Sequence, residues 1–213
     1  MAQPEPDPRL EVVTVDGDVP DSALAEPIAD PTPEAIHDVV VRFDDAVDDW
    51  WDAHLRGRPK IDRMYYIASH LGDFSLIWFM VGAAQGLRSD RDANAFIRLA
   101  VVLGLESLAV NQGIKRLFRR PRPVIEDPHP HPVRKPLTSS FPSGHSSAAF
   151  TAAGILASRD DPLTPVYLAA AAIVATSRIH TRMHHAADVV AGAGLGLAFA
   201  AVARRVWTLP HRR

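Results

Sequence analysis

Apolar residues dominate five stretches of the chain after residue 60, and polar, charged or proline-rich segments separate these stretches. Few positions alternate between apolar and polar residues with a period of two, so the pattern does not predict strands. We therefore expect an all-α protein, built as an antiparallel helical bundle. Its five predicted helices cover about residues 64–87, 95–117, 144–158, 163–179 and 186–205.

Hydropathy alone leaves two environments open for this bundle, the interior of a soluble protein and a lipid bilayer. No stretch reaches the ~18–20 clean apolar residues that make a membrane span obvious. Small residues favour the bilayer, because Gly192 and Gly196 have the GxxxG spacing that lets helices approach closely in lipid. Trp78 and Trp207 suit lipid-facing or interfacial positions. We predict five membrane-spanning helices.

Residues 34–58 show a helical pattern of another kind. Apolar residues recur at spacings of three and four, and six aspartates fill most of the remaining positions, which excludes a membrane span. The pattern indicates either a helix lying at the membrane interface or an amphipathic helix packed on the protein itself. The apolar stripe consists of Ile36, Val39, Val40, Phe43, Val47, Trp50, Trp51 and Leu55.

Charge divides the chain into an acidic arm and a basic body. Residues 1–58 hold 15 acidic and 4 basic residues, whereas residues 59–213 hold 10 acidic and 19 basic residues. Residues 1–33 carry seven of the 18 prolines and few large apolar residues, so we expect disorder there, and they lack the pattern of a secretory signal peptide. We expect a disordered arm (1–33), an amphipathic helix (34–58) and one helical domain (59–213).

Composition also narrows the chemistry. The chain has no cysteine, which excludes disulfides, thiolate metal sites and a cysteine nucleophile. The net charge of −2 gives no indication of a nucleic-acid partner.

The first cluster of candidate chemistry ends the second apolar stretch. Seven basic residues lie between Lys115 and Lys135, and Arg122 is followed by Pro123. Basic residues just outside a hydrophobic helix can anchor it to anionic lipid headgroups. They can also bind a phosphate group, so the cluster alone leaves both roles open.

The second cluster precedes the third apolar stretch. Ser143, Gly144 and His145 stand where the first turn of a helix is expected, and the backbone N–H groups and helix dipole of such a turn favour an anion. Glycine permits close approach of the backbone. An ordinary helix cap followed by an incidental histidine is the alternative.

The third cluster joins the fourth and fifth apolar stretches. His184 and Asp188 are four residues apart and would share one face of a helix. A carboxylate on one imidazole nitrogen fixes the tautomer and leaves the other nitrogen free to attack. A metal site is the weaker interpretation, because the neighbouring Arg178 and Arg182 repel a cation. Antiparallel threading places all three clusters at one end of the bundle.

Taken together, the clusters resemble the signature of the type 2 phosphatidic acid phosphatase (PAP2) superfamily, which includes bacterial non-specific acid phosphatases and vanadium haloperoxidases. The family pattern is K-x6-R-P, then P-S-G-H, then S-R-x5-H-x3-D. Every fixed position has its counterpart here, and the resemblance covers about residues 60–205. The matching residues are Lys115, Arg122, Pro123, Pro142, Ser143, Gly144, His145, Ser177, Arg178, His184 and Asp188.

The resemblance implies phosphate hydrolysis through a phosphohistidine. His184 would attack phosphorus, Asp188 would hold its imidazole, and His145 would protonate the leaving oxygen and later activate water. Because fixed cations would neutralise the phosphate, neither a metal nor a cofactor is expected. The phosphate-binding groups implied by the resemblance are Lys115, Arg122, Ser143, Gly144 and Arg178.

The resemblance also implies a lipid phosphate as substrate and a multi-pass protein of the plasma membrane. The lipid would be a phosphatidate, a phosphatidylglycerophosphate, or a polyprenyl phosphate or diphosphate. A soluble acid phosphatase and a catalytically silent membrane scaffold are the alternatives. Family members usually place the site on the outer face, which we adopt as the expectation, although arginines lie at both ends of the bundle. A homo-oligomer is compatible with the pattern.

Four further polar residues are outside the expected site. Asp73 and Glu106 lie within apolar stretches, where acids are functional candidates. Each is expected either to support an active-site arginine or to serve only as a charge paired with Arg98 or reaching an interface. His180 and His185 have no assigned role.

Overall fold

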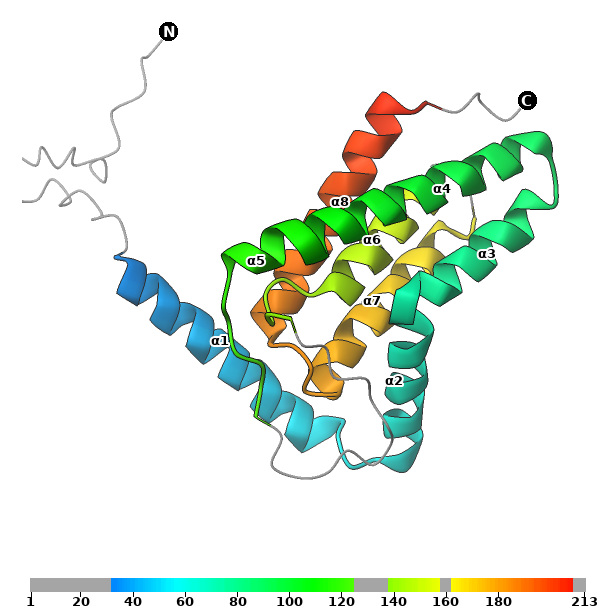
Figure 1. Ribbon diagram of the computed structural model, residues 1–213. Coiled ribbons are helices and arrows are strands. Elements are labelled where there is room, and N and C mark those ends of the chain that lie inside the picture. The colour runs from blue at the N-terminus through cyan, green and yellow to red at the C-terminus, as the bar shows by residue number, and fades with distance from the viewer. Residues whose placement is uncertain (1–31, 125–137, 158–161, 209–213) are drawn as a thin grey trace, which may run out of the picture.

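The computed structural model describes residues 32–124, 138–157 and 162–208, and within these ranges it contains helices and no strands (Figure 1). The predicted all-α class is confirmed. The predicted disordered arm falls almost wholly outside the described residues. The elements are α1 (Pro33–His54), α2 (Pro59–Gly72), η2 (Asp73–Ser75), α3 (Leu76–Gly86), α4 (Asp90–Leu108), η3 (Ala109–Ile114), α5 (Lys115–Leu117), α6 (Gly144–Leu156), α7 (Thr164–His180) and α8 (Ala186–Val206).

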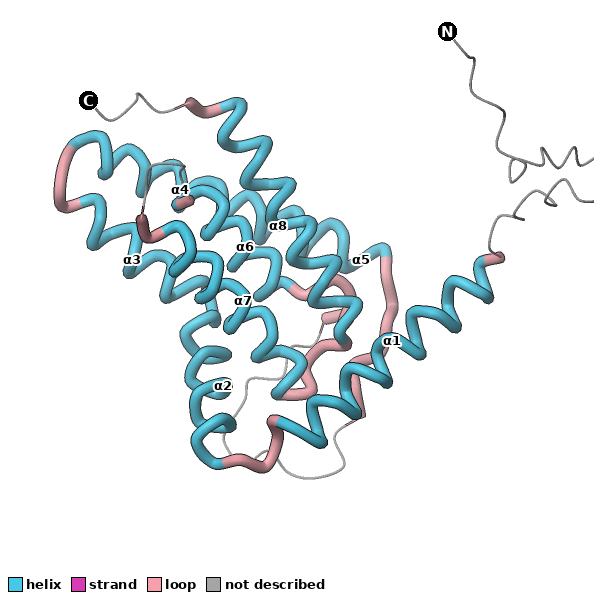
Figure 2. The backbone as a smooth tube through the Cα atoms, turned by 180° about the vertical axis from the view of Figure 1, so that it is seen from behind, coloured by secondary structure: helices cyan, strands magenta, loops and turns pink. Residues whose placement is uncertain are grey.

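Helix α6 lies at the centre of the bundle and packs on α7, α8 and α4 (Figures 1 and 2). Its buried face is built from alanines, and Ala149, Ala152 and Ala153 have no exposed surface. Such small side chains let helix backbones approach closely. Gly192 of α8 adds to this packing, because a Cβ there would lie 2.5 Å from the carbonyl oxygen of Ser143.

The predicted helix 64–87 is two helices with a break between them. Phe74 and Ser75 have φ values of 52° and 59°, in the left-handed region that non-glycine residues rarely adopt. Hydropathy missed this break because both sides of it are apolar. The change of direction between α2 and α3 is visible in Figure 1.

The predicted helix 95–117 begins earlier, at Asp90, and contains a π-helical turn over Ala109–Ile114. The early start follows from its polar first turn, where the side chain of Ser89 accepts a hydrogen bond of 3.1 Å from the N–H of Asp92. The π-turn changes the register of the residues beyond it, and Lys115, the first of them, is buried.

Three helical stretches of the described chain are long and apolar enough to cross a membrane: Pro59–Gly86, Asp90–Leu117 and Ala186–Val206. The other two predicted spans are shorter, since α6 has 13 residues and α7 has 17. At ~1.5 Å per residue these two helices fall short of a ~30 Å hydrocarbon core. The count of five spans stays a prediction.

Helix α1 crosses the end of the bundle beneath α7 and α8 (Figures 1 and 2). Val47 and Trp51 in its second half pack against a small apolar cluster that includes Ile179 and Val189. Ile36 in its first half keeps 51% of its surface exposed. One part of the amphipathic face is thus packed on the protein, and the other part is exposed; its contact with a membrane interface stays a prediction.

Candidate active site

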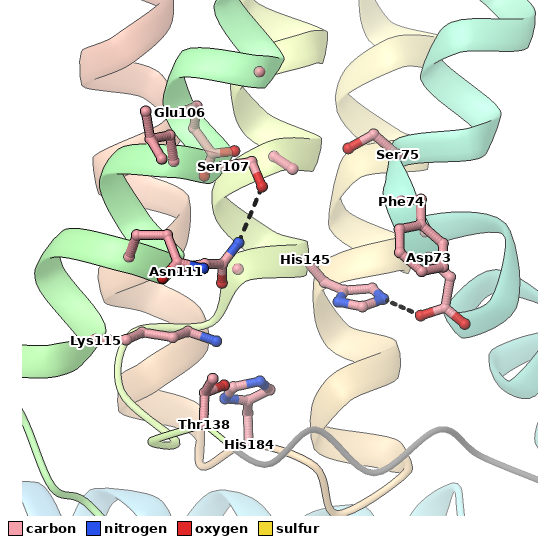
Figure 3. A pocket seen from close by; sticks show the side chains of 16 residues that line it. Asp73, Phe74, Ser75, Glu106, Ser107, Asn111, Lys115, Thr138, His145 and His184 are labelled. Atoms are coloured by element: carbon pink, nitrogen blue, oxygen red, sulfur yellow. Dashed lines mark hydrogen bonds and ion pairs between the residues drawn. The ribbon is translucent and has the colours of Figure 1, made fainter.

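The three sequence clusters meet at the end of the bundle that α1 crosses. They line a cavity of about 610 Å³, which Lys115 enters from α5, His145 from α6 and His184 from the loop between α7 and α8 (Figure 3). Residues of the α2–α3 break and of α4 close its other side. The expected convergence at one pole is therefore found.

His184 is held by the backbone of a tight loop. Its N–H donates to the carbonyl oxygen of Arg178 over 3.1 Å, and Arg182 within the loop has a φ of 48°. Burial lowers the pKa of the His184 imidazole to about 3, and the charges of Arg178 and Arg122 act in the same direction against the opposing effect of Asp188. The side chain is therefore a neutral nitrogen base at ordinary pH.

The two ring nitrogens of His184 have different neighbours. Nε2 lies 3.3 Å from Nη1 of Arg122, on the side of the phosphate-binding cations. Nδ1 lies 3.6 Å from Oδ2 of Asp188, an ion-pair distance that is too long for a hydrogen bond. No other described group bonds Nδ1. This geometry suits attack by Nε2 with the carboxylate behind it.

Asp188 is fully buried and accepts bonds from several donors. Its Oδ2 accepts from the hydroxyl of Ser140 over 2.5 Å and from the N–H of His185 over 3.0 Å. Its Oδ1 accepts from Nη1 of Arg120 over 2.6 Å. Asp188 and His185 thereby form a capping box at the start of α8, which fixes the carboxylate relative to His184.

Arg122 and Arg178 are not among the residues that line the cavity, and hydrogen bonds to neighbouring groups hold both side chains in place. Nη1 of Arg122 donates to the carbonyl oxygen of Met183 over 2.6 Å, and Nη2 donates to that of Thr138 over 3.1 Å. Arg178 is buried and donates to the hydroxyl of Ser69. Burial lowers the pKa of Arg122 although Asp188 opposes the shift, and an arginine remains charged regardless.

The start of α6 combines a cap with an anion-binding geometry. The Ser143 hydroxyl accepts from the N–H of Ser146 over 3.4 Å, so this residue is the N-cap, and it does not line the cavity. Gly144 does line it, and a Cβ at Gly144 would lie 3.7 Å from Nζ of Lys115. The phosphate-binding roles of Ser143 and Gly144 stay predictions, and the structure favours Gly144.

Asp73, which the expected site did not include, lies against His145. Its Oδ1 is 3.0 Å from Nε2 of His145, and the other ring nitrogen faces the interior of the cavity (Figure 3). Asp73 is the first residue of the α2–α3 break and directly precedes the left-handed Phe74. A Cβ on Gly72 would lie 2.8 Å from the His145 ring, so this contact requires glycine. The sequence indicated Asp73 as a candidate because it is an acid within an apolar stretch. Its expected partner was an arginine, whereas its partner in the structure is His145.

Glu106 is buried at the cavity wall, and its Oε1 has no hydrogen-bond partner among the described residues. The alternative pairing with Arg98 is absent there, since Nη1 of Arg98 donates to the carbonyl oxygen of Trp207 over 2.9 Å. His180 contacts Asp62 over 2.9 Å, away from the cavity lining.

Within the described ranges, no group of three or more histidine, cysteine, aspartate or glutamate side chains is placed to hold a metal ion. Lys115 lines the cavity, and Nη1 of Arg122 lies 3.3 Å from Nε2 of His184. These cations can neutralise a phosphate with protein charges alone.

Comparison with known proteins gives the family. A profile of the PAP2 superfamily matches residues 95–211. The decaprenylphosphoryl-5-phosphoribose phosphatase of Mycolicibacterium smegmatis is 32% identical over 151 residues, which cover 71% of this chain and 82% of that protein.

Two solved structures share the fold. The transmembrane PAP2-type phosphatidylglycerolphosphate phosphatase of Bacillus subtilis has a TM-score of 0.62 at 25% identity, over 81% of this chain and 89% of that one. LpxE of Aquifex aeolicus has a TM-score of 0.61 at 20% identity, over 78% and 95% of the two chains. The chain therefore belongs to the PAP2 superfamily and is an all-helical membrane phosphatase.

Proposed function

We propose that the protein hydrolyses the phosphate monoester or diphosphate of a polyprenyl lipid through a phosphohistidine at His184, without a metal ion. The observation that carries this proposal is the placement of the neutral His184 ring, with Nε2 beside Arg122 and Nδ1 facing Asp188, at a cavity that Lys115 and His145 also line.

In the first step, Nε2 of His184 forms a bond to phosphorus as the bond from phosphorus to the lipid oxygen breaks. The leaving oxygen takes a proton from the cavity-facing nitrogen of His145, which Asp73 orients and which carries a proton on both ring nitrogens at the start of the cycle. The imidazole of His184 becomes positively charged, and the carboxylate of Asp188 stabilises it once the 3.6 Å separation shortens.

The non-bridging oxygens of the phosphate lie among Lys115, Arg122 and Arg178 in this mechanism. Phosphoryl transfer depends mainly on positioning and charge stabilisation, and fixed cations supply both. The backbone N–H of Gly144 at the start of α6 adds a dipole whose positive end faces the phosphate.

In the second step, His145 takes a proton from water, and the resulting hydroxide attacks the phosphorus of phosphohistidine. The bond from phosphorus to Nε2 breaks, its electron pair returns to His184, and inorganic phosphate leaves. Each histidine then has its starting protonation state, so the cycle needs no co-reactant.

A lipid substrate is supported by the cavity's border. Phe74 and Leu108 line the cavity and expose 78% and 60% of their surfaces, so apolar side chains extend from the phosphate site to the outside of the bundle. A polyprenyl chain is the first choice because the 32% identical relative is named for a decaprenylphosphoryl substrate. A phosphatidate-type lipid is the next choice.

We place the enzyme in the plasma membrane with the cavity on the outer face. Helix α1 supports a position of this pole at a membrane surface, because it crosses the cavity end and leaves apolar side chains such as Ile36 and Phe43 exposed. Accessibility of this end to a membrane-impermeant label in whole cells tests the orientation.

Phosphate release by the purified protein in detergent tests the activity. The substrates are a polyprenyl phosphate, a polyprenyl diphosphate, a phosphatidate and a soluble monoester. We expect the polyprenyl substrates to react fastest, no loss of activity with a chelator, and inhibition by vanadate. His184→Ala should abolish turnover, and His54→Ala, which changes an exposed histidine of α1, should not. Full activity of His184→Ala, or loss of activity with a chelator, would contradict the mechanism.

A further inference from the structure

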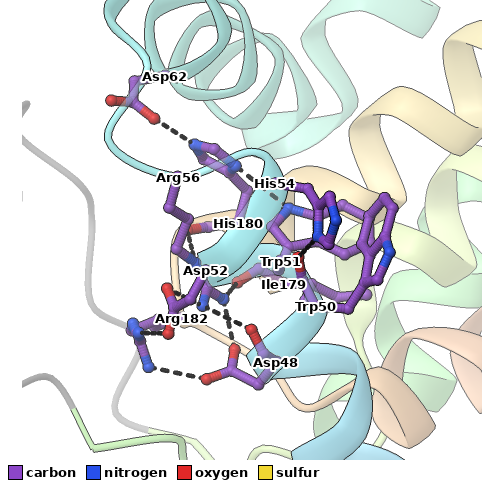
Figure 4. A network of polar contacts seen from close by, with 10 residues as sticks. All are labelled: Asp48, Trp50, Trp51, Asp52, His54, Arg56, Asp62, Ile179, His180 and Arg182. Atoms are coloured by element: carbon purple, nitrogen blue, oxygen red, sulfur yellow. Dashed lines mark hydrogen bonds and ion pairs between the residues drawn. The ribbon is translucent and has the colours of Figure 1, made fainter.

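The family profile matches the chain from residue 95 onward, so helix α1 lies outside the matched part. Ion pairs and hydrogen bonds nevertheless connect α1 to the loop that carries His184. Arg182 of that loop donates to Asp48 over 2.8 Å and to Asp52 over 2.5 Å (Figure 4). Arg56 just beyond α1 donates to the carbonyl oxygen of Ile179 over 2.6 Å. Burial would raise the pKa of Asp52, but the two arginines lower it, so this carboxylate is charged at neutral pH.

Asp44, one turn before Asp48, reaches further into the site. It is 4% exposed although it stands on a helix whose neighbouring positions are mostly open to solvent. Its Oδ1 accepts from the N–H of Ala187 over 2.7 Å, in the first turn of α8. Its Oδ2 accepts from Nη2 of Arg120.

Arg120 connects this carboxylate to the one behind His184. Nη2 donates to Asp44, and Nη1 donates to Oδ1 of Asp188 over 2.6 Å. Burial acts to lower the pKa of Arg120, but the two carboxylates raise it, so the guanidinium is charged. Asp44, Arg120, Asp188 and His184 thus form one line of contacts that runs from α1 to the nucleophile.

The charges along this line explain why a second carboxylate is needed. A guanidinium on Asp188 alone would cancel the negative charge that has to stabilise the His184 imidazolium. Asp44 restores one negative charge, so the group of Asp44, Arg120 and Asp188 carries a net −1. Because the carboxylates are buried, solvent and salt screen this charge weakly.

We propose that Asp44 is a positioning residue of the phosphatase reaction, which holds Arg120 and the start of α8 in place and keeps the region behind His184 negative. This inference rests on the proposed phosphohistidine mechanism. It makes α1 a part of the catalytic unit of this chain, although α1 contributes no group that touches the substrate.

Asp44→Asn tests the charge with little change of shape. The amide oxygen still accepts from the N–H of Ala187, but the negative charge is lost. We expect kcat to fall at least about tenfold, because formation of the imidazolium becomes harder, while KM and the inhibition constant of inorganic phosphate stay within about twofold of the wild-type values. The matched control is Asp45→Asn, which makes the same charge change at the adjacent, exposed position and should leave all three constants unchanged.

A double variant separates a charge effect from a loss of packing. In Asp44→Asn/Arg120→Met the guanidinium that would cancel Asp188 is also gone, so kcat should recover above that of Asp44→Asn. If Asp44→Asn does not fold, the double variant is the test of the charge effect. A kcat of the double variant within about tenfold of the wild-type kcat then supports the proposal.

Three results would overturn it: Asp44→Asn with the same kcat as Asp45→Asn, a KM and a phosphate inhibition constant that rise as strongly as kcat falls, or a double variant as inactive as His184→Ala. A wild-type protein that releases no phosphate from any lipid would instead refute the proposed function, before any variant is made.

Discussion

At the scale of single residues, the site places a neutral imidazole among fixed charges. His184 has cations on one side and the carboxylate of Asp188 on the other, and the carboxylate in turn contacts Arg120. The groups that stabilise the positive charge formed on His184 are therefore in place before substrate binds. Such a preorganised arrangement of charges lowers the barrier of phosphoryl transfer.

The buried His184 should make folding sensitive to acid. Its pKa is about 3 in the folded protein and 6.5 in an unfolded chain, so below pH 6.5 the unfolded state binds more protons and the folded state loses stability. The loss reaches roughly 2 kcal/mol at pH 5. Thermal unfolding in detergent should show a larger drop between pH 7 and pH 5 for wild type than for His184→Gln. Equal drops would contradict a neutral, buried His184.

Removing the charge of Asp73 should slow catalysis through His145. Asp73→Asn keeps the size of the side chain but weakens its hold on the imidazole 3.0 Å away, so proton donation to the leaving oxygen becomes less effective. We expect kcat to fall by about tenfold or more with little change in KM, measured as phosphate release. Asp49→Asn, an exposed aspartate of α1, is the control. A variant with wild-type kcat would exclude a role of Asp73 in the reaction.

At the scale of helices, the contact of α6 with α8 fixes the distance between the second and third of the three sequence clusters. The second cluster lies at the start of α6, and the third cluster ends in α8. Glycines of α8 lie directly against the α6 backbone. A Cβ on Gly196 would overlap the carbonyl oxygen of Ser147 and lie 2.9 Å from the backbone nitrogen of Thr151. Backbone atoms cannot move aside as a flexible side chain can.

Alanine substitutions on α8 should therefore separate into two classes. Gly196→Ala should destabilise the protein by roughly 1–3 kcal/mol, because it overpacks the interface. Gly194→Ala meets nothing within 4 Å and should be neutral or gain up to about 1 kcal/mol from helix propensity. Unfolding midpoints in detergent measure both, and equal midpoints would contradict the close contact of α6 and α8.

At the scale of the whole molecule, the protein should behave as an integral membrane protein. Three of its helical stretches are long and apolar enough to span, and many of their side chains, such as Leu105 and Val202, are exposed on the surface of the bundle. Such a surface is unfavourable in water. We expect the protein to remain in the membrane pellet after carbonate extraction and to dissolve only in detergent. Release by carbonate would indicate peripheral attachment.

Much of this organisation could be predicted from local sequence. The boundaries of α7 and α8 lie within one residue of the predicted helices, because a charge-free stretch, residues 162–177 or 189–203, makes up most of each helix. The convergence of Lys115, His145 and His184 followed from antiparallel threading of consecutive helices. The break at Phe74 could not be predicted, because apolar periodicity carries no information on backbone torsion angles within an apolar stretch.

The sequence by itself determined the helical class, the three motifs and the end of the bundle at which they meet, because these depend on residue spacing along helices. The tertiary structure alone decided the partners of the buried charges: Asp73 contacts His145, and Asp44 reaches Asp188 through Arg120. The partner residues are 72, 76 and 68 positions apart along the chain. Contacts over such separations are set by how helices pack and by the high cost of leaving a buried charge unpaired, and neither can be read from local patterns.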